Sequence, residues 1–98
     1  VRLIDMKDID HAIFDGALVT VVTGGEELLT DLTLLELQRR LPAEQFERVH
    51  RRALVNLEKI ERLQPIPSGG YIAITRSGGE VPVSRQAARS LRKKLGLS

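Results

Sequence analysis

Short stretches of alternating apolar and polar side chains recur along the chain, and this period-two pattern is typical of strands that bury one face. β-Branched residues are concentrated in residues 18–23, and Asp-Gly or Gly-Gly pairs at 15–16, 24–25, 69–70 and 78–79 mark tight turns. Strands are therefore expected over residues 1–4, 12–14, 18–23, 26–29, 60–63, 71–75 and 80–83. Phe46 is expected to anchor a turn, after which residues 47–57 are extended or tightly turned.

Two other segments place apolar residues at the three- and four-residue spacing of a helix. Thr33 and Glu36 form a capping box before a leucine-rich helix that Pro42 ends, and Ser84 can cap a closing helix that Gly96 ends. One face of the closing helix carries Ala88, Leu91 and Leu95, and another carries Arg85, Arg89 and Arg92. About eight to ten short strands and two short helices predict a mostly β fold with antiparallel sheets.

The length of 98 residues, 42% of them apolar, suits one domain over residues 1–98 with a single core. The absence of cysteine excludes thiol catalysis, cysteine-bound zinc and disulfides, and it fits a reducing, cytoplasmic location. No apolar run approaches the roughly 18 residues that span a membrane, and no signal-peptide pattern is visible. Because the sequence opens in strand-like residues without an initiator methionine, we expect a longer protein with another segment before Val1.

Charge is distributed unevenly along the chain. Residues 1–47 hold 4 Lys and Arg against 10 Asp and Glu, whereas residues 48–98 hold 11 against 3, so the two parts carry −6 and +8. Such asymmetry is expected of a small domain that meets a polyanion on one side. Arginine supplies 11 of the 15 cations, and its planar guanidinium matches phosphate and the guanine edge, which favours a nucleic-acid partner.

The segment from Arg48 to Asn56 reads Arg-Val-His-Arg-Arg-Ala-Leu-Val-Asn. Its valines and leucine are the residue types most often buried, whereas its arginines cannot be buried without partners. The segment must therefore have one anchoring face and one face offered to an anion. The alternative is that these arginines form surface salt bridges, for example between Arg51 and Glu47 or Glu58.

The run Phe46-Glu-Arg-Val-His-Arg-Arg-Ala-Leu-Val-Asn56, followed by Ile60 and then by Val81-Pro-Val-Ser-Arg85, resembles the core signature of the LytTR (LytR/AlgR-type) DNA-binding domain of bacterial response regulators. The resemblance implies an elongated stack of short antiparallel sheets with two short helices. It also implies transcription regulation by binding double-stranded promoter DNA, with loops in successive major grooves. Two domains would pair on repeated half-sites, and a receiver domain would precede this output domain.

The resemblance places two arginines at base contacts: Arg51, which follows the signature histidine, and Arg85, which follows the serine of the second motif. Both are guanine-reading types. A third loop falls near Asp15-Gly16-Ala17, which offers no long donor. Arg52 stands where the family often has serine, and we assign it to phosphate. The predicted phosphate contacts are Arg48, Arg52, Lys59, Arg76 and Arg89.

His50 and Asn56 are interpreted as structural support, because a lone histidine beside valine is more often hydrogen-bonded than catalytic. A metal cluster of the following residues is discounted, since strand alternation would scatter their side chains: Asp8, Asp10, His11 and Asp15. No nucleophile and base pair can be defended, so we expect neither enzymatic activity nor a metal or cofactor.

The runner-up function is a ligand-sensing β module that binds a cyclic dinucleotide through the arginines between Arg48 and Arg52. The acidic-serine-glycine motif of PilZ-like cyclic-di-GMP sensors is missing from the chain. Single-stranded RNA binding is weaker still, because aromatic residues make up only 3% of the chain and stacking platforms need them.

Overall fold

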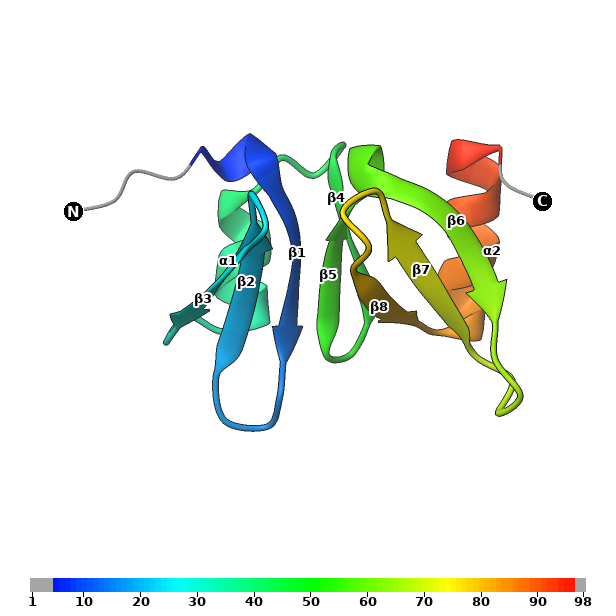
Figure 1. The fold of residues 1–98 in the computed structure, drawn as a ribbon, viewed down its shortest axis with the longest axis horizontal. Coiled ribbons are helices and arrows are strands. Elements are labelled where there is room, and N and C mark those ends of the chain that lie inside the picture. The colour runs from blue at the N-terminus through cyan, green and yellow to red at the C-terminus, as the bar shows by residue number, and fades with distance from the viewer. Residues whose placement is uncertain (1–4, 97–98) are drawn as a thin grey trace.

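The computed structural model describes residues 5–96, which form two antiparallel sheets and two α-helices (Figure 1). The strands are β1 (Ile9–Phe14), β2 (Val19–Thr23), β3 (Glu26–Thr30), β4 (Phe46–His50), β5 (Ala53–Asn56), β6 (Ile60–Pro65), β7 (Tyr71–Thr75) and β8 (Glu80–Val83). The helices are α1 (Leu34–Arg40) and α2 (Arg85–Leu95), with short 3-10 turns η1 (Met6–Asp8) and η2 (Leu57–Lys59). The fold class predicted from the sequence is confirmed, while the strand expected over residues 1–4 lies outside the described residues.

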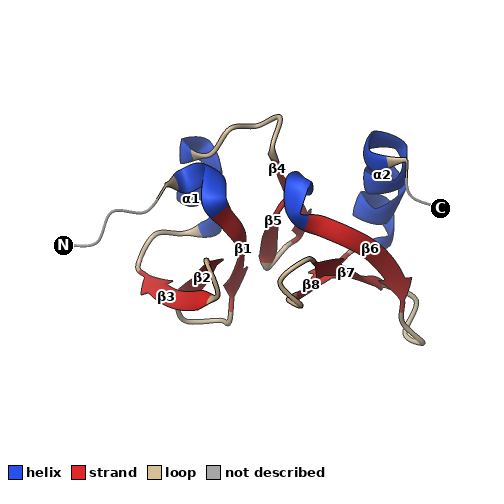
Figure 2. Cartoon of the chain, turned by 45° about the horizontal axis from the view of Figure 1, so that its top comes forward, coloured by secondary structure: helices blue, strands red, loops and turns tan. Residues whose placement is uncertain are grey.

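The first sheet has the strand order β3-β2-β1-β5-β4, so β5 pairs with β1 although Ala53, the partner of Ile13, lies 40 positions later in the chain. Helix α1 covers one face of this sheet (Figure 2). Their shared core contains Ile9, Ala12, Val19, Val21, Leu34, Leu37, Leu41, Phe46 and Leu54. Phe46 anchors a turn as expected, because its N–H donates to the carbonyl of Pro42 at 3.0 Å and its ring, 4% exposed, lies in this core at the start of β4.

The second sheet has the order β6-β7-β8, and α2 packs against it (Figure 2). The second core contains Val49, Ala53, Val55, Ile60, Ala73, Val81, Val83, Ala88 and Leu91. Strand β5 therefore serves both cores, because Leu54 faces the first while Ala53 and Val55 face the second. Since β5 is buried on both faces, the position of the β4–β5 turn is fixed by the packing of the whole domain.

Both predicted caps are present. In α1 the Thr33 hydroxyl accepts from the backbone N–H of Glu36 at 3.1 Å, and the Glu36 carboxylate accepts from the N–H of Thr33 at 3.0 Å. In α2 the Ser84 hydroxyl accepts from the N–H of Ala87 at 3.1 Å, and Gly96 ends the helix. No helix within residues 5–96 is long and apolar enough to cross a membrane.

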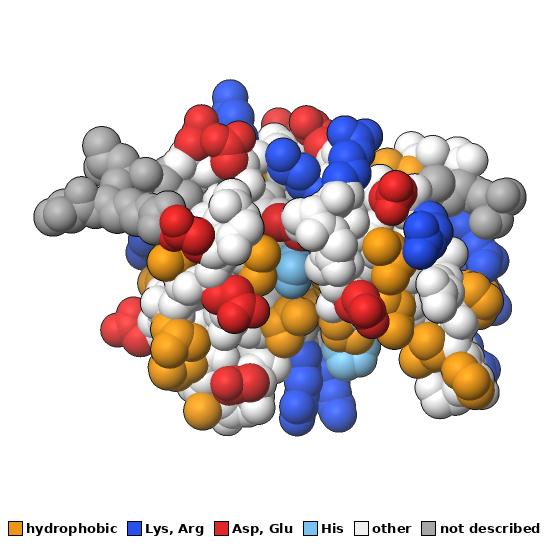
Figure 3. Space-filling view, in the orientation of Figure 1, with side chains coloured by type: hydrophobic (Ala, Val, Ile, Leu, Met, Phe, Trp, Pro, Cys, Tyr) orange, Lys and Arg blue, Asp and Glu red, His pale blue; other side chains and the backbone are white. Residues whose placement is uncertain are grey.

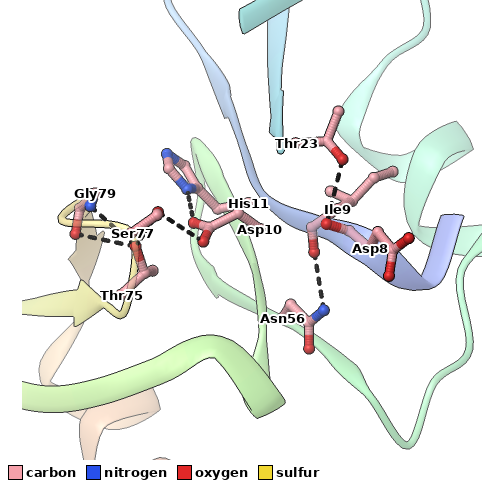
Figure 4. Close-up of polar contacts among 9 residues, drawn as sticks. All are labelled: Asp8, Ile9, Asp10, His11, Thr23, Asn56, Thr75, Ser77 and Gly79. Atoms are coloured by element: carbon pink, nitrogen blue, oxygen red, sulfur yellow. Dashed lines mark hydrogen bonds and ion pairs between the residues drawn. The ribbon is translucent and has the colours of Figure 1, made fainter. Parts of the chain in front are cut away.

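A polar bridge joins the two sheets away from the apolar cores (Figure 4). The pairing register shifts between Ile9 and His11, and this irregularity brings the carboxylate of Asp10 within 2.5 Å of Nδ1 of buried His11. The expectation that alternation separates these two side chains was therefore wrong. Ser77, in the β7–β8 turn, donates to the other oxygen of Asp10 at 3.0 Å, which fixes the second sheet against β1.

Candidate nucleic-acid interface

Successive elements run in opposite directions through the domain, so alternate connections fall at the same end (Figure 1). At the lower end lie the connections β1–β2, β3–α1, β4–β5, β6–β7 and β8–α2, over residues 15–18, 31–33, 51–52, 66–70 and 84. We call this end the loop edge. Arg51 and Arg85, predicted to contact bases, both lie on it, at the β4–β5 turn and at the start of α2.

Hydrogen bonds join the neighbouring connections of the loop edge. The N–H of Phe14, at the end of β1, donates to the carbonyl of Arg52 at 2.9 Å. The N–H of Ser84 donates to the carbonyl of Val49 at 2.8 Å, which ties the start of α2 to β4. Nε of Arg85 donates to the carbonyl of Gly69 at 2.6 Å. The loop edge is therefore a connected, preorganised surface rather than a set of independent loops.

The β4–β5 turn is braced by its own side chains. Nε and Nη2 of Arg48 donate to the carbonyls of His50 and Arg51, at 3.0 and 2.5 Å. The N–H of Arg52 donates to Nδ1 of His50 at 3.1 Å. Arg51 and Arg52 are both exposed on this turn, and basic side chains protrude below β5 in the space-filling view (Figure 3). The turn thus holds two arginines outward while Arg48 and His50 stabilise its backbone.

Arg85 is the first residue of α2, and its exposed side chain folds over the β6–β7 loop. Gly69 in that loop has φ +99°, and a Cβ built there would lie 1.9 Å from Nη2 of Arg85. Only glycine fits this place without moving the guanidinium. The sequence predicted the turn at residues 69–70, but nothing in a Gly-Gly pair indicates that it receives an arginine sixteen residues later.

The β1–β2 loop, which offers no long donor, is fixed by Asp15. Its Oδ1 accepts from the backbone N–H groups of Ala17 at 2.8 Å and Leu18 at 2.9 Å. These hydrogen bonds hold the pKa of the Asp15 carboxyl below its ordinary value, and the bond from Leu18 has the largest effect. The nearby charge of Arg52 acts in the same direction. Leu18 is left 41% exposed at the loop edge.

The described residues give no ion pair to Arg51 or Arg85. Glu47, the partner considered for Arg51, instead forms an ion pair with Lys94 of α2. The remaining ion pairs within residues 5–96 join Arg62 to Glu61 and His11 to Asp10. The salt-bridge alternative for the two arginines is therefore not found in this part of the chain, and their guanidinium groups have donors to offer a ligand.

Two of the predicted phosphate contacts lie elsewhere. Lys59, in η2, and Arg76, in the β7–β8 turn, are at the end opposite the loop edge, where the N–H of Arg76 donates to the carbonyl of Lys59 at 2.9 Å. Arg89 is exposed on α2 one turn after Arg85. The structure thus brings Arg48, Arg51, Arg52, Arg85 and Arg89 toward one end but separates Lys59 and Arg76 from them.

Asn56, at the end of β5, is fully buried and bonded on both sides of its amide. Nδ2 donates to the carbonyl of Ile9 at 2.8 Å (Figure 4). Oδ1 accepts from the N–H of Glu58 at 2.9 Å. It therefore ties β5 to β1 and to η2, away from the loop edge. No group of three or more His, Cys, Asp and Glu within residues 5–96 could hold a metal ion.

A small domain of paired antiparallel sheets with arginines on an edge of preorganised loops has the form of a nucleic-acid-binding module. Residues 1–96 match the family model described as the LytTr DNA-binding domain. The chain belongs to this LytTR family, as its two sequence motifs predicted. A solved LytTr DNA-binding domain from Bacillus cereus has the same fold, with a TM-score of 0.80 and 24% identity over 96% of this chain and 86% of that one.

Among curated relatives, the sensory transduction protein LytT of Bacillus subtilis is 37% identical over 95% of this chain and 39% of its own length. The heme-containing CO-sensing transcriptional regulator RcoM 2 of Paraburkholderia xenovorans is 36% identical over 99% of this chain and 37% of its length. The transcriptional regulatory protein BtsR of Escherichia coli is 36% identical over 99% and 40%. The chain thus spans about two fifths of the length of these relatives.

Proposed function

We propose that this chain binds double-stranded promoter DNA and reads bases in the major groove with Arg51 and Arg85, as part of a bacterial transcription regulator. The observation that carries this proposal is that both arginines lie exposed on one hydrogen-bonded edge, without an acidic partner within residues 5–96. Family membership adds that related domains bind DNA.

Base reading by arginine depends on geometry as well as charge. The guanidinium fork can donate two parallel hydrogen bonds to O6 and N7 of guanine, and each such pair discriminates against the wrong base by about 1–3 kcal/mol. The brace of Arg48 fixes the backbone from which Arg51 projects, and the bond to the carbonyl of Gly69 restricts where the Arg85 fork can lie before DNA arrives. That restriction lowers the entropy lost on binding.

Phosphate contacts are proposed for the arginines that lie beside Arg51 and Arg85. Arg52 shares the turn with Arg51, and Arg89 follows Arg85 by one helical turn. Arg48 uses two of its five N–H donors within the turn, so the two of Nη1 and the second of Nη2 remain for a phosphate. A duplex that follows the loop edge meets neither Lys59 nor Arg76, so phosphate contact by these two stays a prediction that requires DNA to reach the opposite end.

The partners expected from the sequence are proposals as well. Pairing of two domains on repeated half-sites follows from the family resemblance, as does an upstream receiver domain. The relatives' names include both response regulators and CO-sensing regulators that contain heme, so the sensory part can differ between proteins that share this domain. A cytoplasmic location fits a transcription regulator. The cyclic-dinucleotide alternative and the absence of enzymatic activity stay predictions.

The test begins with selection of binding sites from a random duplex library, followed by affinity measurements for the parent domain, Arg51→Ala and Arg85→Ala. Each variant is expected to lose about 1–3 kcal/mol and to relax the preference at particular guanines. Arg62→Ala is the matched control, because Arg62 is exposed on β6 and pairs only with Glu61. If both variants bind the selected site as tightly as the parent domain, the roles of Arg51 and Arg85 are refuted.

A further inference from the structure

A hollow lies beside the loop edge, between the β1–β2 loop, the start of α1 and the β4–β5 turn. It has a volume of about 340 Å³, within the range of small-ligand sites. Its large apolar lining residues are Phe14, Leu18, Val19, Leu32, Leu34 and Leu35. Arg48 and Arg51 line the same cavity, so an apolar wall meets two guanidinium groups.

Exposed leucines are concentrated at this cavity. Within residues 5–96 the large apolar residues with high exposure are Leu18 at 41%, Leu29 at 68% and Leu35 at 50%, and two of these three line the cavity. Neither Leu18 nor Leu35 belongs to the apolar cores of the domain. Exposed apolar side chains gathered in one hollow and bordered by charge are typical of a binding site.

The charged groups decide which ligand fits. Arg51 has no ion pair within the described chain, and Arg48 uses only Nε and Nη2 in the brace of the turn. Asp31 also lines the cavity, but its single negative charge is outnumbered by the positive charges of Arg48 and Arg51. An anion at the arginine end with an apolar body along the leucines satisfies both parts of the lining.

We infer that this cavity binds a small apolar carboxylate, with the carboxylate on Arg48 and Arg51 and the hydrocarbon against Leu18 and Leu35. Binding itself is independent of the proposed function. The effect of the ligand on DNA binding rests on that function, because a carboxylate bound to Arg51 would keep this side chain away from guanine. The domain would then release promoter DNA in response to a metabolite-sized acid.

Octanoate is the probe, with octanol and octylamine as controls of equal chain length. Amide NMR titration of the DNA-free domain should show octanoate moving signals of residues 14–19, 31–35 and 48–51, with at least tenfold weaker binding of octanol and none of octylamine. Leu35→Asn and Arg51→Gln should each weaken octanoate binding at least fivefold. Leu29→Asn, an exposed leucine outside the cavity, should leave it unchanged.

A second measurement adds saturating octanoate to the domain bound to its selected DNA site, and affinity for DNA should fall at least fivefold for the parent domain but not for Leu35→Asn. Equal binding of octanoate and octanol would overturn recognition of the carboxylate. Absence of octanoate binding, together with weaker DNA binding by Leu35→Asn, would show that DNA itself covers the cavity. Because the first titration contains no DNA, its failure is distinct from failure of the proposed function.

Discussion

The close approach of Gly69 and Arg85 predicts that Gly69→Ala alters DNA recognition without touching any DNA contact directly. The alanine Cβ would lie 1.9 Å from Nη2 and 2.8 Å from Cζ of Arg85, so the guanidinium must leave the Gly69 carbonyl. The obstacle is the far end of a flexible side chain, which can move. The substitution should therefore relocate Arg85 rather than unfold the β6–β7 loop.

Two effects of different size are expected. Alanine at φ +99° carries a backbone strain of about 1–3 kcal/mol, a loss that a domain with 5–15 kcal/mol of stability can tolerate. Relocation of Arg85 should cost part of its guanine contact, about 1 kcal/mol or roughly fivefold in affinity, at the lower end of the 1–3 kcal/mol range for such contacts.

Gly78→Ala is the matched control. Gly78 has φ +90° and no atom within 4 Å of a built Cβ, and it lies in the β7–β8 turn, opposite the loop edge. Urea denaturation should report a similar loss of stability for both variants, while affinity for the selected site should fall only for Gly69→Ala. In the double variant Gly69→Ala with Arg85→Ala, affinity should be no lower than for Arg85→Ala alone. Equal affinities of Gly69→Ala and Gly78→Ala would refute a role for Gly69 in positioning Arg85.

Four further outcomes are expected. Ser84→Ala removes the cap of α2 and should lower the free energy of unfolding by about 1 kcal/mol in urea denaturation, and an unchanged value would contradict the role of the cap. The lowered pKa of Asp15 stabilises the fold above its unfolded pKa, and this contribution is lost as pH falls through the folded pKa, so Asp15→Asn should flatten the acid limb of stability against pH. Arg89→Ala should reduce the salt slope of DNA binding by about 1. Arg76→Ala should leave that slope unchanged if the duplex follows the loop edge, and an equal reduction would place DNA at both ends.

Local features of the fold were predictable because their signals lie within a few residues. The capping box of Thr33 and Glu36 and the cap of Ser84 depend on side chains that bond to backbone three residues away. The pairing of β5 with β1 had no such signal, because it depends on apolar residues on both faces of β5 finding two separate cores. The place of Phe46 in β4, directly after the turn that it anchors, likewise shows only in the assembled core.

The candidate site was also predictable only in part. Residue type and motif position indicated Arg51 and Arg85, and the structure adds the groups that hold them: the brace of Arg48 and the space left by Gly69. The brace bonds to backbone carbonyls, which every residue possesses, and a glycine in a turn does not indicate which side chain packs over it. Neither feature could therefore be predicted from the sequence. Glu47 is a further case, because its ion pair with Lys94 joins residues that only the packing of α2 against β4 brings together.

The end of the domain at which a connection lies indicates the proposed interface more directly than the charge asymmetry along the sequence does. Each element of this domain reverses the direction of the one before it, so a residue in one connection and a residue in the next lie at opposite ends (Figure 1). Arg51 and Arg85 lie at the end of the domain that forms the loop edge, whereas Lys59 and Arg76 lie at the opposite end. All four belong to the basic half of the chain, yet only the first pair can meet one duplex along the loop edge. A basic residue is therefore assigned to the proposed interface by the connection it occupies. The same rule puts Asp31 and Leu18 at the end of the domain that holds Arg51, where all three line the proposed ligand cavity.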